Sequence, residues 1–255
     1  MRLLRRSEHV VPTIDLRTEF TASWDSLEIH GQGIHHTADG SLLATEALLR
    51  WRRSANELWA AGMILPIAEQ TSRIEECTNR ATELAISHWA RRSDAPHGGR
   101  LALNLHHTQL ARPTVADEIE ELLERHTLRA DNLLLEIPDH IGPDACRRAV
   151  DHLASLCADG ARLALDDHRG EGSATRPSPD WLPTGSIVKL DRALVGSCDD
   201  AFGRDILART ADELHAQGYD LVAQAVERPA QLASVMASRI AYTQGCLAGA
   251  PQPIG

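Results

Sequence analysis

The sequence lacks the features of several protein classes. Its five cysteines, among 255 residues, show no paired spacing, which argues against a disulfide framework and against a zinc site. No apolar run is long enough to cross a bilayer, and the basic start Met1–Arg6 is not followed by the apolar stretch of a signal peptide. We therefore expect a cytoplasmic protein. Negative charge also outweighs positive charge, which gives a formal net charge of −10. Since this charge repels a phosphate backbone, nucleic acid is an unexpected partner.

The remaining composition is that of a globular protein with one core. Hydrophobic residues make up 43% of the chain, and a length of 255 residues suits a single barrel of ordinary size. Residues 1–20 are predicted to be a tail or a partner-contacting arm, because chain termini are often poorly ordered. Residues 21–255 are predicted to be one barrel domain. An acidic domain can still bind a small phosphorylated ligand, since a bound divalent cation reverses the local sign of charge.

Eight short apolar segments are predicted to be strands. The first two are separated only by His35–Gly40, which is too short for a crossover helix, so they should pair antiparallel. The others alternate with helical patterns and should pair parallel. The predicted fold is therefore α/β, a TIM-type (β/α)8 barrel with an antiparallel first strand. The strands are expected at about 26–33, 42–49, 101–105, 133–137, 162–166, 187–190, 221–224 and 241–244.

Amphipathic segments lie between these strands. Helices are expected at about 114–126, at about 143–158 with Gly160 after it, and from Pro229 onward. The loop Arg169–Pro183 follows an acidic pair and is either a lid or a solvated loop. The side chains expected to face the core are Val115, Ile119, Leu122, Leu123 and His126 in the first helix, Cys146, Ala149, Val150, Leu153 and Cys157 in the second, and Leu232, Val235 and Met236 in the third.

Polar or charged residues end most of the predicted strands. In parallel barrels the chemistry is carried at the carboxyl ends of the strands, where carboxylates and amides can supply the oxygen ligands of a hard cation. One such residue alone is more often a solvated surface group, and adjacent aspartates often only shape a turn. Their repetition on successive strands favours a metal site that could act on a phosphodiester. The strand-end residues are Glu46, Asn104, Glu136, Asp166, Asp167, Lys189, Gln224 and Gln244.

These segments resemble a known family. The run Thr45–Trp51, TEALLRW, is similar to the signature of the EAL domains, bacterial phosphodiesterases that linearise cyclic di-GMP. The tripeptide alone would carry little weight, but further matches follow in the family's order from roughly residue 24 to the C-terminus. They are Gln32, Pro66, Ala68–Glu69, Asn104, Leu135–Ile137, Asp166–Asp167, Lys189–Asp191, Val226–Glu227, Gln231 and Gln244–Gly245.

The resemblance implies a role for each matching residue. A first Mg²⁺ or Mn²⁺ ion would be bound by Glu46, Asn104, Glu136 and Asp166, and a second, weaker one by Asp166 and Asp167. The catalytic positions would be those of Lys189, which would contact the nucleophilic water, Gln224 and Glu227. Cyclic di-GMP would be contacted by Gln32, Leu48, Arg50, Asp191 and Gln244, with the forked guanidinium of Arg50 on a phosphate. The family also implies a homodimer, with Asp139 anchoring the loop after the acidic pair.

The sequence departs from the family at several of these positions. Active relatives carry a Glu-Gly-Val-Glu run where this chain has Gln224–Glu227, and a neutral amide binds a hard cation weakly and cannot accept a proton. The loop His168–Gly172 differs from the family's Phe-Gly-Thr-Gly run, and Gly31 and Gly33 replace the tyrosine and proline that flank Gln32 in relatives. Asn104 is followed by His106 and His107 where relatives have a serine; paired histidines are either ligands of a softer metal or plain surface groups.

Three functions are compatible with this pattern. The leading hypothesis is a degenerate EAL domain that binds cyclic di-GMP, with hydrolysis lost or strongly impaired. The second is a slow metal-dependent phosphodiesterase that yields linear pGpG. The third is a protein-binding scaffold that no longer binds a nucleotide.

Overall fold

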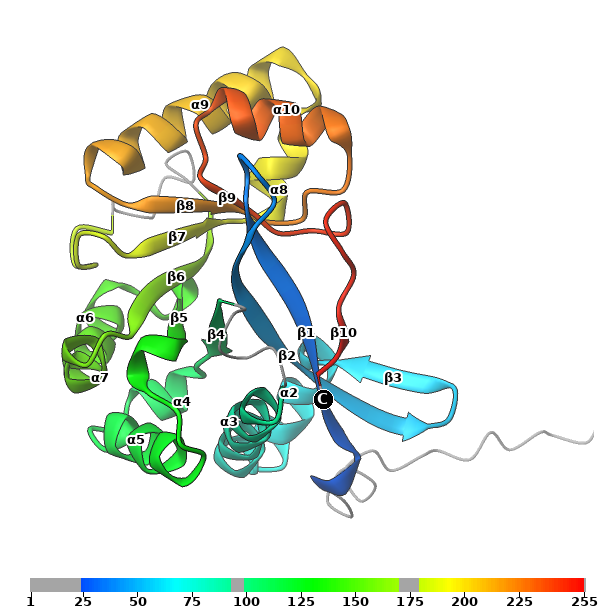
Figure 1. Ribbon diagram of the computed structural model, residues 1–255, viewed down its shortest axis with the longest axis vertical. Helices are drawn as coiled ribbons and strands as arrows, with labels where there is room; N and C mark the ends of the chain where they lie inside the picture. Colours follow the sequence, from blue (N-terminus) through cyan, green and yellow to red (C-terminus); the bar gives the residue numbers. More distant parts are fainter. Residues whose placement is uncertain (1–23, 93–98, 170–178, 255) are drawn as a thin grey trace, which may run out of the picture.

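The chain folds into a closed barrel with helices on its outside (Figure 1). The computed structural model describes residues 24–92, 99–169 and 179–254. The strands pair parallel in the order β2, β4, β5, β6, β7, β8 and β9, and β1 pairs antiparallel with both β2 and β9, which closes the barrel. The predicted TIM-type barrel with an antiparallel first strand is confirmed. The barrel strands are β1 (Leu27–His36), β2 (Leu42–Ser54), β4 (Arg100–Asn104), β5 (Leu133–Pro138), β6 (Arg162–His168), β7 (Ile187–Leu190), β8 (Asp220–Ala223) and β9 (Tyr242–Thr243).

The first hairpin is longer than predicted. β2 continues to Ser54 and forms a second hairpin with β3 (Glu57–Ala60), which the sequence analysis did not predict. The rings of Trp51 and Trp59 meet edge to face across this hairpin at 5.5 Å, and the Arg53 guanidinium lies 4.5 Å from the Trp59 ring. These contacts stabilise a strand pair that projects beyond the barrel (Figure 1).

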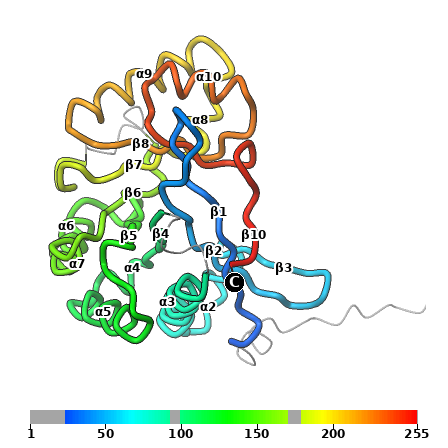
Figure 2. The backbone as a smooth tube through the Cα atoms, in the orientation of Figure 1, coloured from blue at the N-terminus to red at the C-terminus, as the bar shows by residue number. Residues whose placement is uncertain are grey.

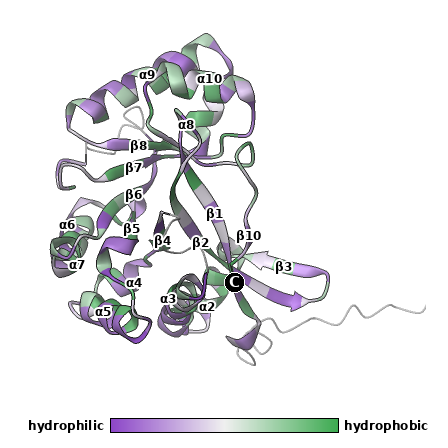
Figure 3. Cartoon of the chain, in the orientation of Figure 1, coloured by the Kyte–Doolittle hydropathy of each residue, from purple (hydrophilic) through white to green (hydrophobic). Residues whose placement is uncertain are grey.

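Helices cover the outer face of the strands. Several of them, including α3, α5 and α9, alternate hydrophobic and hydrophilic residues along their length (Figure 3), as expected for helices with one face against a sheet. Leu153 divides the helix predicted at 143–158 into two, because its φ of −96° and ψ of 6° are not helical. The helices are α2 (Ala61–Gln70), α3 (Ile74–Ala90), α4 (His107–Leu110), α5 (Val115–Arg125), α6 (Pro143–His152), α7 (Ala154–Ala158), α8 (Arg192–Gly196), α9 (Ala201–Ala216) and α10 (Pro229–Ala237).

The predicted inner faces of the helices are largely confirmed. α5 buries Val115, Ile119, Leu122 and Leu123, at the spacing of one helix face. The prediction for Met236 was wrong, since its side chain is 54% exposed. α10 turns Val235 inward, so the next residue along the helix points away from the core.

The two ends of the described chain meet on one side of the barrel. β10 (Gln252–Pro253) pairs antiparallel with β1, so the first and last strands lie side by side (Figure 2). The predicted tail 1–20 lies outside the described residues, as does most of the loop Arg169–Pro183. Among the described residues, no helix has both the length and the apolar character needed to span a membrane.

The interior of the barrel contains one apolar layer. Each of the eight barrel strands contributes one residue to it, and these residues are buried on the inner face of the sheet. A separate, larger core fills the space between the strands and the surrounding helices. The inner layer consists of Ile34, Ala44, Ala102, Leu134, Ala164, Ile187, Val222 and Tyr242.

Candidate metal and nucleotide site

A polar layer lies next to the apolar layer inside the barrel. Side chains alternate between the two faces of a strand, so residues two positions apart point to the same side. Each member of this polar layer stands two positions beyond an inner-layer residue, or two before it on the antiparallel β1. The strand pattern therefore directs all of them toward the same end of the barrel interior. The polar layer consists of Gln32, Glu46, Asn104, Glu136, Asp166, Lys189, Gln224 and Gln244.

Lys189 is the centre of the polar layer. It is the only lysine of the chain, and its side chain is fully buried. Its Nζ lies 2.7 Å from Glu136 Oε2, 2.9 Å from Asp166 Oδ1 and 3.5 Å from Glu46 Oε1. Burial alone would lower the pKa of Lys189, but the three carboxylates raise it well above 10.5. The ammonium group is therefore charged and holds carboxylates from three strands together.

Glu46 is fixed by amide donors. Asn104 Nδ2 donates to Glu46 Oε1 at 2.7 Å, and Gln244 Nε2 donates to Glu46 Oε2 at 2.5 Å. Gln32 lies opposite Glu46 in the β1–β2 pairing, and its Oε1 is 3.5 Å from Gln244 Nε2. Burial alone would raise the pKa of Glu46, but Lys189 and the two amides lower it below 4.5. Glu46 is thus an ionised carboxylate held in one orientation.

Among the described residues, two buried oxygens of the polar layer find no hydrogen-bond partner. They are Glu136 Oε1 and Gln224 Oε1. Buried acceptors are normally satisfied, so such atoms call for a donor or a cation. Burial raises the pKa of Glu136 well above 4.5, despite the opposing charge of Lys189. Oxygens of Glu46, Glu136 and Asp166 surround Lys189 Nζ, and Asn104 contacts Glu46; carboxylates and amides are the groups that a hard divalent cation prefers.

Gln224 donates a hydrogen bond to Asp166, which an ionised carboxylate at this position could not do. Its Nε2 donates to Asp166 Oδ1 at 2.9 Å. A glutamate of the same shape would place a second negative charge against Asp166, and two adjacent carboxylates require a shared proton or a cation between them. The amide thus satisfies Asp166 by a hydrogen bond and needs no cation to do so.

A cavity of about 310 Å³ adjoins the polar layer. Its walls come from the ends of β2, β4 and β6 and from apolar side chains of α2 and α3. Asp167 reaches this cavity from a left-handed backbone conformation, φ 59°, at an irregularity in β6. The cavity therefore brings the predicted second metal residue beside the first set. Predicted site residues on its wall are Glu46, Leu48, Asn104, Asp166 and Asp167.

The other predicted ligand-contacting residues lie around this centre. Arg50 is half-buried on the same face of β2 as Glu46, and its Nη1 donates to Leu49 O at 2.9 Å. Burial lowers the pKa of Arg50, while Glu46 opposes that effect. Asp191 caps α8 by accepting a hydrogen bond from Ala193 N at 2.7 Å.

The structure also describes the predicted loop anchor, Asp139, and the third predicted catalytic position, Glu227. Asp139 Oδ2 lies 3.3 Å from His168 Nδ1, so the end of β5 contacts the start of the loop after the acidic pair. Glu227 has an exposed side chain, and its backbone N–H donates to Gln231 Oε1 at 2.9 Å. Glu227 is therefore not brought into the buried polar layer with Gln224.

Sequence reasoning did not identify the backbone features that hold Gln224 in place. Ala225 has a φ of 55°, a conformation that favours glycine. A Cβ on Gly245 would lie 2.2 Å from Val226 O, so only glycine permits this approach between the segments that carry Gln224 and Gln244. Relatives carry a glycine at the position of Ala225, in their Glu-Gly-Val-Glu run, and that glycine could have indicated the left-handed backbone there.

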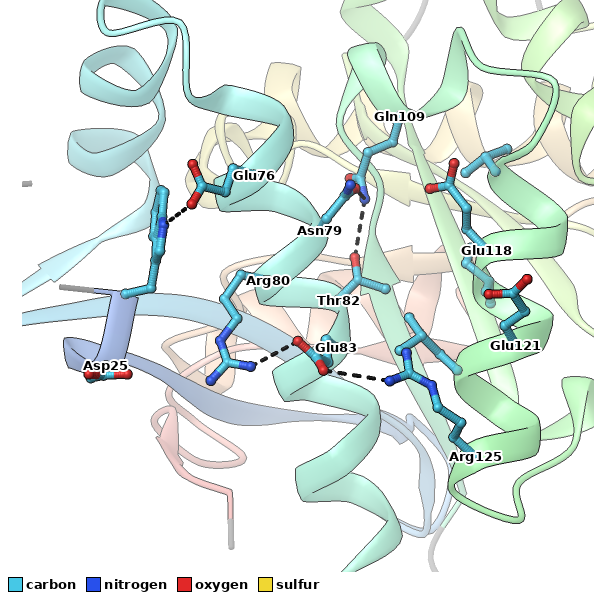
Figure 4. Close-up of a pocket in the computed structure, with 14 residues that line it drawn as sticks. Asp25, Glu76, Asn79, Arg80, Thr82, Glu83, Gln109, Glu118, Glu121 and Arg125 are labelled. Carbon is cyan, nitrogen blue, oxygen red and sulfur yellow. Dashed lines mark hydrogen bonds and ion pairs between the residues drawn. The ribbon is translucent and has the colours of Figure 1, made fainter. Parts of the chain in front are cut away.

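A second cavity, of about 670 Å³, lies between α3 and α5 (Figure 4). Its wall includes Glu76, Glu83, Glu118 and Arg125 but none of the predicted site residues. One ion pair crosses it, from Glu83 on α3 to Arg125 on α5 at 3.9 Å, and Glu83 also pairs with Arg80 on its own helix (Figure 4). The predicted chemistry therefore belongs to the smaller cavity at the polar layer.

Comparison with known proteins identifies the family of this fold and site. Residues 15–251 match the family described as EAL domain. The chain belongs to the EAL domain family. The domain is 28% identical over 232 residues to the bifunctional diguanylate cyclase/cyclic di-GMP phosphodiesterase MucR of Pseudomonas aeruginosa, which covers 89% of this chain and 33% of the relative.

Further relatives place the EAL domain in longer proteins. It is 29% identical to the cyclic di-GMP phosphodiesterase NbdA of Pseudomonas aeruginosa, over 90% of this chain and 29% of that protein. The chain thus spans about a third of these relatives. Among solved structures, a complex of the PaMucR phosphodiesterase with c-di-GMP matches with a TM-score of 0.78 and 25% identity, over 89% of this chain and 92% of that one. The FimX EAL domain from Pseudomonas aeruginosa matches in fold, with a TM-score of 0.79 at 18% identity, over 93% of this chain and 94% of that one.

Proposed function

We propose that this EAL domain binds cyclic di-GMP in the cytoplasm with one divalent cation, Mg²⁺ or Mn²⁺, and that its hydrolysis is lost or strongly impaired. The observation that carries this proposal is the hydrogen bond from Gln224 Nε2 to Asp166 Oδ1 at 2.9 Å. The amide takes the place of a carboxylate that would have bound a second cation, and it cannot accept a proton from water. Binding and cleavage are thereby separated in one site.

The first cation would be bound in the polar layer. Glu46, Asn104, Glu136 and Asp166 would hold the cation, and the orphaned Glu136 Oε1 supports this assignment. When bound, the cation would polarise a phosphate oxygen of the ligand and lower the pKa of a coordinated water. Lys189 keeps the carboxylates in register and supplies positive charge beside the phosphate. Asp167 would contribute to a second cation only weakly, because Gln224 offers no charge there.

The cyclic dinucleotide would lie across the polar layer and its cavity. Arg50 would pair with a phosphate, since its fork of donors matches phosphate geometry. Gln32 and Gln244 would face a nucleotide edge, and Leu48 would contact a base from the cavity wall. Asp191 would lie at the margin of this site. The contact between Asp139 and His168 supports the assignment of Asp139 as the anchor of the loop after Asp167, and through that loop a homodimer is proposed.

A second function is favoured by one observation. Lys189 pairs with Glu46, Glu136 and Asp166, and the presence of these groups supports slow metal-dependent formation of linear pGpG. Loss of a general base typically costs about two to four powers of ten in rate, so some turnover would remain. If cyclic di-GMP does not bind, the remaining hypothesis is a protein-binding scaffold.

Titration calorimetry tests the proposal. Cyclic di-GMP should bind the native chain in the presence of Mg²⁺, and Arg50→Ala should weaken binding about 10- to 100-fold, since hydrogen bonds to charged groups contribute about 1.5–3 kcal/mol. Arg52→Ala is the matched control, because Arg52 is two positions along β2 and is engaged by Glu28. Absence of binding at high micromolar ligand, or equal losses in both variants, would refute a nucleotide site here.

A further inference from the structure

A cluster of imidazole and carboxylate groups lies beside the polar layer and is separate from it. One ligand atom each from Glu69, His106 and His107 lies within 4.8 Å of the others. Glu69 is near the end of α2, while His106 and His107 begin α4, so two elements far apart in sequence meet here. His106 and His107 line the same cavity as Asn104 and Asp166.

The spacing of these groups suits a tetrahedral metal. His106 Nε2 lies 3.5 Å from Glu69 Oε1. Ligands bound to Zn²⁺ at about 2.0–2.2 Å with tetrahedral angles are separated by roughly 3.4 Å. The rings of His106 and His107 have centroids 4.1 Å apart and are tilted by 41°, so a small rotation of the exposed His107 brings its nitrogen into the same shell.

The ring of His106 is held so that Nε2 faces the cluster. Its Nδ1 accepts a hydrogen bond from Thr108 N at 3.4 Å, as the N-cap of α4, and lies 3.0 Å from Thr108 Oγ1. A metal at Nε2 requires the other tautomer, in which Nδ1–H donates to Thr108 Oγ1, and a partner of this kind normally orients a ligating histidine.

The backbone under His106 is also fixed. His106 N donates to Gln109 Oε1 at 3.1 Å, and Gln109 Nε2 reaches Asn79 Oδ1 at 3.2 Å and Thr82 Oγ1 at 3.3 Å on α3. Figure 4 shows the Gln109 side chain directed between Asn79 and Thr82. The start of α4 is therefore tied to α3, which makes the position of His106 a property of the fold.

We propose that Glu69, His106 and His107 form a binding site for a borderline-soft divalent cation such as Zn²⁺, distinct from the oxygen-rich polar layer. Imidazole nitrogens select such cations, whereas the carboxylates and amides of the polar layer select Mg²⁺ or Mn²⁺. Three protein ligands leave a fourth position for water or an anionic ligand, directed to the cavity that the two sites share.

Zn²⁺ titration in a large excess of Mg²⁺ tests this site, since Mg²⁺ occupies the polar layer. The native chain should take up one equivalent of Zn²⁺, and Co²⁺ in its place should give the intense visible absorption of a tetrahedral ion. His107→Ala and His106→Ser should each weaken Zn²⁺ at least about 100-fold, because even loss of an orienting partner costs about 10- to 100-fold. Serine keeps a good N-cap for α4 while removing the ring. Thr108→Val should weaken Zn²⁺ by about 10-fold through the ring orientation alone.

His126→Ala is the matched control, because His126 follows α5 and is not part of the cluster. It should leave Zn²⁺ binding unchanged. Circular dichroism spectra confirm that each variant is folded, and the exposed His107 gives a variant with little risk to folding. The proposal is overturned if no saturable Zn²⁺ binding survives excess Mg²⁺, or if His126→Ala weakens it as much as His107→Ala does.

Discussion

Replacing Lys189 by methionine removes the charge at the centre of the polar layer while keeping most of its volume. The buried Nζ lies 2.7, 2.9 and 3.5 Å from carboxylate oxygens of Glu136, Asp166 and Glu46. Breaking a buried ion pair by removing one partner typically costs about 3–5 kcal/mol, because a charge remains buried without compensation. We expect a loss in this range for Lys189→Met, measured by urea unfolding with tryptophan fluorescence at neutral pH.

The pH dependence of this loss has a definite sign. The folded-state pKa of Lys189 lies above 10.5, so its stabilising contribution is present below pH 10.5 and is lost only as the pH rises through the folded value. The folded-state pKa of Glu136 lies above 4.5, so the folded state becomes less favoured as the pH rises above 4.5 toward that value. Without Lys189 this second effect should dominate, and Lys189→Met should regain stability as the pH falls from neutral toward 4.5.

Mg²⁺ provides a further test of the same variant. A divalent cation bound by the stranded carboxylates should restore part of the lost stability, by an amount that grows with its concentration. Arg209→Met is the matched control, because Arg209 forms an exposed pair with Asp205 at 3.0 Å and should matter by less than about 1 kcal/mol. A loss for Lys189→Met no larger than that of the control would refute the view of Lys189 as the charge that holds the site together.

Two further predictions concern the backbone and the thiols. Ala225→Gly should stabilise the chain by about 0.5–1 kcal/mol, since it relieves a left-handed φ of 55°, whereas Ala223→Gly in β8 should destabilise it; chemical denaturation decides between these signs. Burial raises the pKa of the Cys77 and Cys146 thiols to about 12, so at about pH 8 a maleimide should label the exposed Cys246 first; prompt labelling of Cys77 in the native state would contradict its burial.

The barrel and most of its polar layer could be predicted from the sequence, because apolar runs that end on Glu46, Glu136 or Lys189 carry a period that places those side chains inside. The second hairpin could not, since Glu57–Ala60 is short and is stabilised by the contact between Trp51 and Trp59 across it. The helix α3 was missed because its buried face includes Thr78 and Thr82, which weaken the apolar pattern. The orphaned oxygens of Glu136 and Gln224 depend on three-dimensional packing and have no signal in the sequence.

In the proposed function, one amide, Gln224, separates nucleotide binding from cleavage. Formation of linear pGpG from cyclic di-GMP by the native chain and by Gln224→Glu, both with Mn²⁺, tests it most directly. We predict that Gln224→Glu forms the product about 100- to 10,000-fold faster than the native chain, the range expected for restoring a general base. Equal rates in the two proteins, whether fast or undetectable, would contradict the claim and would place the control of cleavage elsewhere in the site.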